Sequence, residues 1–291
     1  MDGFDILDMP TLRTPVVIIA FTGWSDTGTV TVDTVQRLVD AYRGQRYLTV
    51  DPEEYYVFTD TRPTVKLDAD GIREIEWPRN EAYAATLSGT SHDLVLIKGV
   101  EPNLRWRTFA THFADMIGEL KPSLVCTLVA RPAATPHTRP VPVTGSSADP
   151  LLAARFGLGR SMYQGPTGIV GVIHDSLRRH NAPLISLAAS VPHYLNVDEN
   201  PPATMALLKA LEPVIGLAPP LGDLEGEGVR FVERVEEASR GDEQIRAYVR
   251  TLEEHYGEPQ GETATDGGEL PTTDEILRDI EDLLRGSGSG T

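Results

Sequence analysis

Charged, aromatic and histidine side chains gather in four loops that each follow an apolar segment. These loops have the sequences TGWSDTG, GVEPNLRWR, ARPAATPHTRP and SVPHYLNVD. If the apolar segments are parallel strands, their carboxyl ends meet at one edge of a sheet, where open α/β proteins bind ligands. That edge would hold Trp24, Asp26, Glu101, Arg105, Arg107, Arg131, His137, Arg139 and His193.

Arginines near helix N-termini are suited to holding an anion. The loops therefore predict an anion or ligand pocket made by Trp24, Asp26, Glu101, Arg105, Arg107, His137 and Arg139. A structural interpretation stays open beside it. The arginines can tie long loops to acidic neighbours, and polar side chains can bind backbone groups that proline-rich loops leave unpaired.

The residues that catalysis would need do not form a known motif. His137 is the candidate general base and Glu101 its candidate partner, but no serine stands in a G-x-S-x-G elbow. The seven histidines show no H-E-x-x-H or H-x-H spacing, and C-x-x-C is absent. Cys126, the one cysteine, lies in an apolar run and is expected to be a buried structural thiol. We expect no catalytic residues, no metal site and no cofactor.

The charge of the chain is acidic and uneven. Its formal value is -17, and the part from Leu221 onward holds 7 Arg and 19 Asp and Glu, which is -12 of that total. This balance argues against non-specific binding to nucleic acid and against attraction to anionic membranes. The first ten residues form no signal peptide, and the apolar run 16–21 is too short to span a bilayer. We expect a soluble cytoplasmic protein.

Apolar runs alternate with helical stripes through the first 217 residues. The runs predict strands at 16–21, 46–50, 93–98, 124–129 and 183–189. The stripes predict helices at 32–42, 104–120, 150–156, 168–180 and 201–215, with a long loop at 130–149. Asp26 or Thr27 is expected to cap the first helix, and Asn103 the second. The alternation predicts an α/β fold with a mostly parallel sheet and helices on both faces.

Two further parts interrupt or follow this alternation. Residues 65–77 alternate around a turn at 68–71 and predict a β-hairpin, at the edge of the sheet or beside it. Beyond Leu217, linkers at 218–228 and 257–269 separate short amphipathic helices near 231–238, 245–256 and 272–284. We expect an α/β domain over 1–217 and an acidic helical extension over 218–291. Such short helices need the domain, another subunit or a client to cover them.

An ordered set of motifs resembles the PAC2 family, which is named for the second proteasome assembly chaperone of eukaryotes. The motifs are FTGWSDTG (21–28), TRPTV (61–65), REIEWP (73–78), DLVLIKGVEPNLRWRTF (93–109), PHTRPVPVTG (136–145), GPTGIVGVIHD (165–175) and SVPHYLN (190–196). They span roughly Pro15 to Leu217. The acidic helical tail is similar to the extra C-terminal segment of actinobacterial members.

The resemblance implies a phosphorylase-like and hydrolase-like α/β body and a non-enzymatic role as an assembly chaperone or scaffold linked to the proteasome. It carries over no catalytic residues. It also implies self-association, with a trimer favoured by the architectural analogy. The hydrophobic-Tyr-any tail with which the eukaryotic chaperones dock on the proteasome ring has no counterpart in the final GSGSGT.

Large aromatics are enriched at the centres of interfaces. Trp24, Tyr55, Tyr56, Trp77 and Trp106 are therefore expected to be exposed and available for contact between subunits. The alternative function is a protein or enzyme that binds a nucleoside-like or phosphate-bearing small molecule, because the implied body is phosphorylase-like and the arginines converge.

Overall fold

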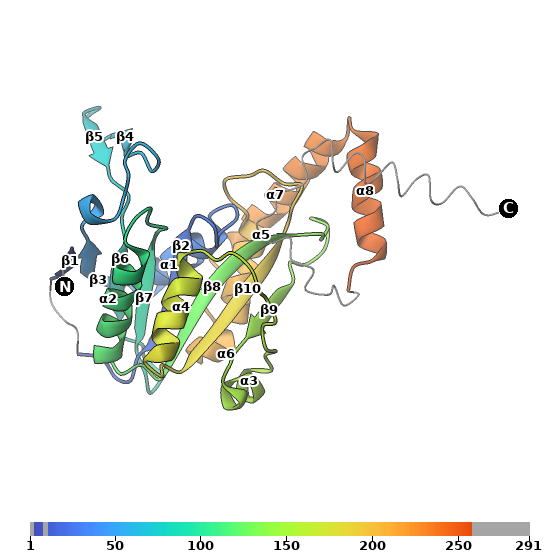
Figure 1. Ribbon diagram of the computed structural model, residues 1–291. Helices are drawn as coiled ribbons and strands as arrows, with labels where there is room; N and C mark the ends of the chain where they lie inside the picture. Colours follow the sequence, from blue (N-terminus) through green and yellow to red (C-terminus); the bar gives the residue numbers. More distant parts are fainter. Residues whose placement is uncertain (1–2, 8–10, 258–291) are drawn as a thin grey trace.

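The computed structural model describes residues 3–7 and 11–257, and an eight-stranded sheet lies at its centre (Figure 1). Its strands run in the spatial order β1-β3-β6-β7-β2-β8-β10-β9. They are β1 (Phe4–Ile6), β2 (Val16–Thr22), β3 (Gln45–Val50), β6 (Glu81–Ala85), β7 (Leu94–Val100), β8 (Leu124–Ala133), β9 (Val143–Ser146) and β10 (Leu184–Pro192). The strands β4 (Thr64–Leu67) and β5 (Arg73–Glu76) form a separate two-stranded sheet.

The helices lie between and after these strands. They are α1 (Val30–Ala41), the short 3₁₀ helix η1 (Pro52–Glu54), α2 (Trp106–Glu119), α3 (Pro150–Phe156), α4 (Ile169–Arg179), α5 (Pro201–Ala210), α6 (Glu212–Ile215), α7 (Leu224–Ser239) and α8 (Glu243–Glu254). None of the helices within residues 3–7 and 11–257 is both long and apolar enough to cross a bilayer.

The middle of the main sheet is parallel and its margins are antiparallel. Strand β2 runs parallel to β7 and β8, and β8 runs parallel to β10. Strands β6, β3 and β1 continue the sheet antiparallel on one side, and β9 does so on the other. The predicted α/β class is confirmed. The separate hairpin sheet is confirmed too, lying beside the main sheet rather than at its edge.

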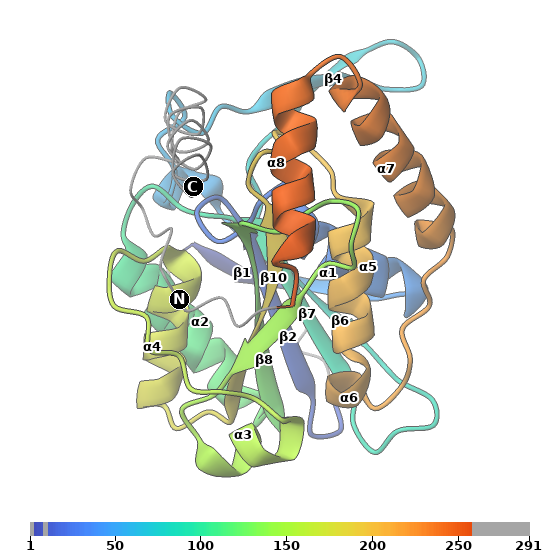
Figure 2. The same ribbon diagram turned by 90° about the vertical axis from the view of Figure 1, so that its right-hand side faces the viewer.

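Helices cover both faces of this sheet, which explains the continuous apolar runs in its central strands. Figure 2 shows α2 and α4 on one face and α1 and α5 on the other. Along β2, Ile18 belongs to the cluster that contains Leu38 of α1, whereas Ile19 belongs to the cluster that contains Phe109 of α2. All four side chains are fully buried. Because successive strand residues face opposite sides, a strand between two helical layers needs apolar residues at every position.

The structure corrects the predicted strands at the margins of the sheet. Strand β8 continues to Ala133, and β9 lies inside the long loop that we expected at 130–149. Strands β1 and β6 were not predicted at all. Short marginal strands such as EAYAA and VTGS lack a continuous β-branched run, and pairing with a longer neighbour stabilises them instead.

Two helix boundaries also differ from the prediction. Asn103 does not cap α2, which begins at Trp106 after Arg105. The side chain of Asn103 instead accepts hydrogen bonds from the Val57 backbone at 3.0 Å and the Thr61 hydroxyl at 3.0 Å, so it holds the root of the hairpin. The predicted helix 201–215 is divided into α5 and α6 near Pro213, whose ring nitrogen cannot donate to the preceding turn.

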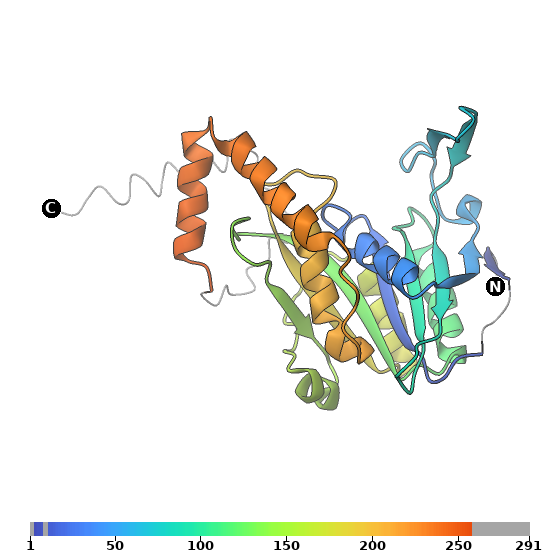
Figure 3. The same ribbon diagram turned by 180° about the vertical axis from the view of Figure 1, so that it is seen from behind.

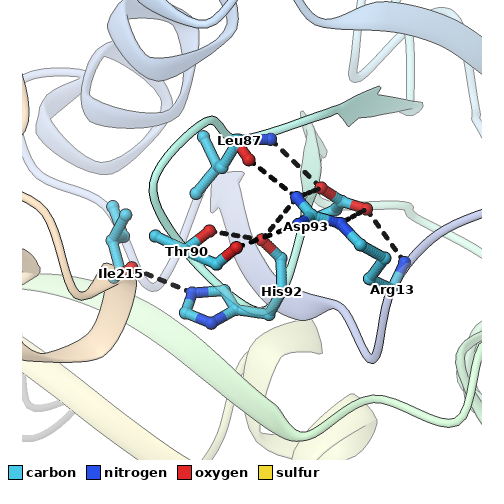
Figure 4. Close-up of polar contacts among 6 residues, drawn as sticks. All are labelled: Arg13, Leu87, Thr90, His92, Asp93 and Ile215. Atoms are coloured by element: carbon cyan, nitrogen blue, oxygen red, sulfur yellow. Dashed lines mark hydrogen bonds and ion pairs between the residues drawn. The ribbon is translucent and has the colours of Figure 1, made fainter.

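The amino ends of the central strands are held together by one buried carboxylate (Figure 4). Asp93, just before β7, accepts from the Arg13 backbone at 2.9 Å, from Arg13 Nε at 3.2 Å and Nη2 at 2.5 Å, and from the Leu87 backbone at 3.1 Å. The Arg13 hydrogen bond lowers the pKa of Asp93 to about 2. Beside it, His92 Nε2 lies 2.9 Å from the carbonyl oxygen of Ile215, which joins this corner to the end of α6.

The two helices after residue 217 differ in how they contact the body. Helix α7 begins at Leu224, inside the predicted linker, and packs on α5 with Leu224 and Phe231 buried. Glu227 of this helix pairs with Arg37 of α1 at 2.5 Å. Helix α8 is offset from the sheet and covers loops at its carboxyl edge (Figures 1 and 3). The predicted helix 272–284 lies outside the described residues.

Candidate functional site

The predicted site residues do lie in loops after the parallel strands, but they have separate surroundings. Glu101 and Trp24 meet beside the start of α4, Asp26 lies against the start of α1, and His137 and His193 lie beneath α8. The arginines do not join any of these groups through the ion pairs and hydrogen bonds of residues 3–7 and 11–257.

Glu101 is packed tightly against two glycines. A Cβ atom on Gly23 would lie 2.8 Å from the Cβ of Glu101, and one on Gly168 would lie 2.9 Å from its Oε2. Gly23 also has a φ of 107°, which side chains rarely adopt. Glycine at these two positions is what lets the carboxyl group approach the first residues of α4. Trp24 borders the same corner and is 53% exposed.

Burial dominates the electrostatics of Glu101. It raises the pKa of this carboxyl group, and the backbone N–H groups of Ile169 and Trp24 oppose the rise. The Oε2 atom is buried and has no hydrogen-bond partner within the described part of the chain. The N–H groups at the start of α4 favour the charged form, but no cationic side chain among the described residues adds to them, so burial prevails and Glu101 keeps its proton more readily than an exposed carboxyl group does.

Asp26 supplies the predicted hydrogen bond to the start of the first helix, although the N-cap position itself is Thr29, whose side chain makes no capping bond. Asp26 Oδ1 accepts from the backbone N–H of Thr31 at 2.9 Å, inside the first turn of α1. Thr27, the other candidate, donates to the carbonyl oxygen of Ala130 at 3.2 Å instead. Burial raises the pKa of Asp26 to about 6, and the hydrogen bonds from Thr31 oppose the rise. The carboxyl edge thus carries two acidic groups whose pKa values are raised.

The arginines of the predicted pocket are dispersed. Arg105 pairs with Glu54 of η1, as the structural interpretation expected for an arginine that ties a loop to an acidic neighbour. Arg107, Arg131 and Arg139 are exposed, and none of them has an ion-pair partner in the described residues. An anion site formed by several arginines stays a prediction.

The two histidines meet in a cluster that α8 completes. The His137 backbone donates to the Tyr194 hydroxyl oxygen at 2.8 Å, and His137 Nδ1 lies 2.7 Å from the same oxygen. The other ring nitrogen of His137, Nε2, is buried and has no hydrogen-bond partner in the described chain. His193 Nδ1 lies 3.0 Å from the Ala133 carbonyl, and its Nε2 lies 3.2 Å from the Tyr248 hydroxyl.

Contacts from α8 close over this histidine cluster, by which we mean His137, His193, Tyr194 and Tyr248. Glu253 accepts from the Thr138 hydroxyl, and the Tyr256 hydroxyl donates to the Pro140 carbonyl at 2.8 Å. Burial lowers the pKa of His137, while Glu236 and Glu253 oppose that effect. The sequence predicted the helix and placed Tyr248 on its apolar stripe. It did not predict that the stripe would lie on two loops more than 50 residues away.

Exposed apolar side chains concentrate on the β4–β5 hairpin. Val65, Leu67, Ile72 and Ile75 are 56–67% exposed, and Trp77 is 39% exposed. At the root, Trp77 packs edge-to-face on Phe58 with ring centroids 4.8 Å apart. Of the aromatics expected on the surface, Trp24 and Trp77 are exposed, and Trp106 is half-buried against the core. Tyr55 and Tyr56 are buried at 0% and 4%, so the expectation was wrong for the two tyrosines.

Two surface hollows lie elsewhere, along α7 and the start of α5. They measure about 450 and 270 Å³, and Glu199, Pro201 and Glu227 line both. None of the predicted site residues lines either hollow. Within residues 3–7 and 11–257, no three His, Cys, Asp or Glu side chains are grouped so that they could hold a metal ion. Cys126 is fully buried, and burial raises the pKa of its thiol.

Several solved structures share this fold, and their descriptions name the PAC2 family or the proteasome. A PAC2 family protein from Streptomyces avermitilis is 40% identical, with a TM-score of 0.74 over 81% of this chain and 99% of its own. A proteasome-assembly chaperone homologue from Mycobacterium tuberculosis is 37% identical, with a TM-score of 0.72 over 80% and 99%. An archaeal proteasome activator from Pyrococcus furiosus shares the fold at 16% identity, with a TM-score of 0.66 over 81% and 98%.

Among curated proteins, none matches the chain significantly. The sequence itself fits the PAC2 family model over residues 20–239, which include the four loops at the carboxyl edge, the hairpin and α7. This match covers well over half of the chain, and two structures of the same type exceed one third identity over four fifths of it. The chain belongs to the PAC2 family.

Proposed function

We propose that this chain is a non-enzymatic, self-associating protein of the cytoplasm that acts as an assembly chaperone or scaffold for proteasome subunits. The observation that carries the proposal is the exposed apolar surface of the β4–β5 hairpin, where four aliphatic side chains are 56–67% exposed. Apolar groups of this number on one projecting element are typical of a protein-binding surface. A similar protein from Mycobacterium tuberculosis is described as a proteasome-assembly chaperone homologue, which supports the choice of client.

The division of labour within the chain is part of the proposal. We assign self-association to the α/β domain of residues 1–217, and a contact with another subunit or with a client to the acidic extension of residues 218–291. The shallow attachment of α8 supports the second assignment, since Val249 and Leu252 are its only buried residues. A chain that ends at Leu217 should keep a cooperative melt and lose a partner contact. A chain of this length that fails to melt cooperatively would contradict the division.

The test of the client is an assembly reaction with purified components. Proteasome α and β subunits from the same organism are mixed with and without the chain, and the assembled particles are followed by native gel electrophoresis. We expect faster or more complete assembly, together with a complex between the chain and one type of subunit. Unchanged assembly and no complex at micromolar concentrations would contradict the assembly role.

A second candidate function rests on the raised pKa values at the carboxyl edge. Asp26 and Glu101 are acidic groups in positions where α/β proteins bind ligands, and perturbed pKa values cluster at such sites. The candidate is binding, with or without a reaction, of a nucleoside-like or phosphate-bearing compound. Thermal shifts with phosphate, nucleosides and nucleotides test it. A ligand at 100 times its Kd adds about 2.7 kcal/mol of stability, and a gain that is lost in Arg105→Ala or Arg139→Ala would favour this candidate.

A further inference from the structure

The β4–β5 hairpin is an amphipathic sheet that pairs with no strand of the main sheet. It projects from the body between β3 and β6 (Figures 1 and 3). Its register pairs Val65 with Ile75 and Leu67 with Arg73. Because directly paired residues lie on the same side of a two-stranded sheet, these four side chains share one face. We call this the apolar face.

The opposite face of the hairpin is polar and already satisfied. It carries Thr64 paired with Glu76 and Lys66 paired with Glu74, and Lys66 also forms an ion pair with Glu76 at 2.5 Å. The apolar face has no such internal partner. Val65 is 59% exposed, Leu67 is 67% exposed and Ile75 is 56% exposed. A two-stranded hairpin that leaves its apolar side in water is marginal by itself, so contact with another surface would stabilise it.

The exposed apolar area of the hairpin is large enough for a specific contact between two copies of the chain. Val65, Leu67, Ile75, Ile72 at the tip and Trp77 at the root offer roughly 100 Å² each, or about 500 Å² for one hairpin. Two hairpins in contact would bury about 1,000 Å² in total, which reaches the lower limit of specific protein interfaces.

The arrangement of side chains indicates that the apolar face binds the apolar face of a second copy of the chain. The Val65–Ile75 pair lies in the middle of the face, with Leu67 towards the tip and Trp77 at the root. A rotation about an axis near the middle pair therefore brings apolar groups onto apolar groups, as a symmetric interface requires. Arg73, the one charge on this face, stands near the tip, where its long side chain can keep the guanidinium in water.

We propose that copies of this chain bind one another through the apolar faces of their β4–β5 hairpins. The proposal rests on the self-association stated above and names the surface that performs it. Two faces can meet about a twofold axis, and three can turn towards a threefold axis, which is the arrangement for the favoured trimer. In either case Lys66, Glu74 and Glu76 stay on the outside of the contact.

Two matched substitutions on one strand test the surface. Val65→Lys places a charge in the middle of the apolar face, whereas Thr64→Lys places the same charge on the polar face, opposite Glu76. Sedimentation velocity on the full chain at tens of micromolar should show an oligomer for the wild type and for Thr64→Lys. Val65→Lys should raise the dissociation constant about 100-fold and sediment as one subunit, with an unchanged melt of the body. Ile75→Lys repeats the test should Val65→Lys fail to fold.

The outcomes separate this surface from the proposed function. A wild type that is monomeric at this concentration overturns both self-association and the hairpin contact. An oligomer that survives Val65→Lys and Ile75→Lys overturns the hairpin contact alone and leaves self-association standing. Dissociation by Thr64→Lys to the same extent as by Val65→Lys would also overturn it, because the effect would then not depend on the face. Slower amide hydrogen exchange at 64–76 as concentration rises would support it.

Discussion

The buried carboxyl groups at the two ends of the parallel strands differ in their hydrogen-bond partners and in the direction of their pKa shifts. At the amino ends, Asp93 receives four hydrogen bonds, three of them from Arg13, and its pKa falls to about 2. At the carboxyl ends, Asp26 and Glu101 meet backbone N–H groups but no cationic side chain of the described residues, and both pKa values rise. A fully paired carboxylate stabilises the fold, whereas an underpartnered one costs stability and is typical of working surfaces.

Removal of Asp93 should have the largest effect on stability, because it removes the fully hydrogen-bonded carboxylate at the amino ends of the strands. Asp93→Ala leaves the Leu87 N–H and the Arg13 backbone N–H without their acceptor, and loss of these charge-assisted bonds should lower the free energy of unfolding by about 3 kcal/mol. Urea unfolding at pH 7 measures it. Asp175→Ala, which removes an exposed ion-paired carboxylate, is the control and should change stability by less than about 1 kcal/mol. Equal losses would mean that the amino end is not specially stabilised.

Gly23→Ala should have the next largest effect and tests the packing at the carboxyl end. The new Cβ would lie 2.8 Å from Glu101 and the residue would keep a φ of 107°, so we expect a loss of about 2–3 kcal/mol. Gly71→Ala is matched for backbone, with a φ of 77°, but has no heavy atom within 4 Å of the new Cβ. Its loss should be about 1 kcal/mol. Thermal unfolding of both variants decides whether Glu101 is clamped as described.

Asp26→Asn should give a smaller effect with a distinctive pH dependence. The pKa of Asp26 is raised to about 6 in the fold, so its protonated form contributes stability below about pH 4 that is lost as the pH rises through 6. Asparagine keeps the oxygen that caps α1 and cannot ionise. The variant should therefore exceed the wild type by about 2 kcal/mol at pH 8 and match it at pH 4. Asp93 has the opposite sign, since its contribution is present above about pH 4 and is lost as the pH falls towards 2. A constant difference across this range would contradict the raised pKa.

The smallest effect should come from loosening α8. Tyr248→Phe removes the hydroxyl that reaches His193, at a local cost of about 1 kcal/mol. Hydrogen exchange should quicken in 243–254 and stay unchanged in α7. Because burial lowers the pKa of His137, the neutral form is favoured in the fold, and its contribution, present above about pH 6.5, is lost as the pH falls through the lowered value. After correction for the intrinsic exchange rate, the protection of the α8 amides in the wild type should thus fall as the pH drops below 6.5, and a constant protection would contradict a role for His137.

Runs such as VVIIAF, and LVLI within DLVLIK, predicted the central strands because every residue in them is apolar, which a strand between two helical layers requires. The marginal strands β6 and β9 escaped prediction since their stability comes from a neighbour rather than from their own composition. The loops of the candidate site were predicted for a similar reason: they follow the central strands. Their partners were not, because Arg105 pairs with a residue 51 positions away and α8 reaches Thr138 across 115 positions. Local patterns do not encode such pairings.

The independence of the β4–β5 hairpin has a consequence for how proteins of this architecture diversify. Its strands share no hydrogen-bond ladder with the main sheet, and its apolar face lies outside both buried clusters of the body. Substitutions, insertions or a complete exchange of residues 64–76 should therefore leave the stability of the body unchanged. If the hairpin selects the partner as proposed, transplanting residues 64–76 of one such protein into another should transfer the choice of partner and leave the melting behaviour of the recipient intact.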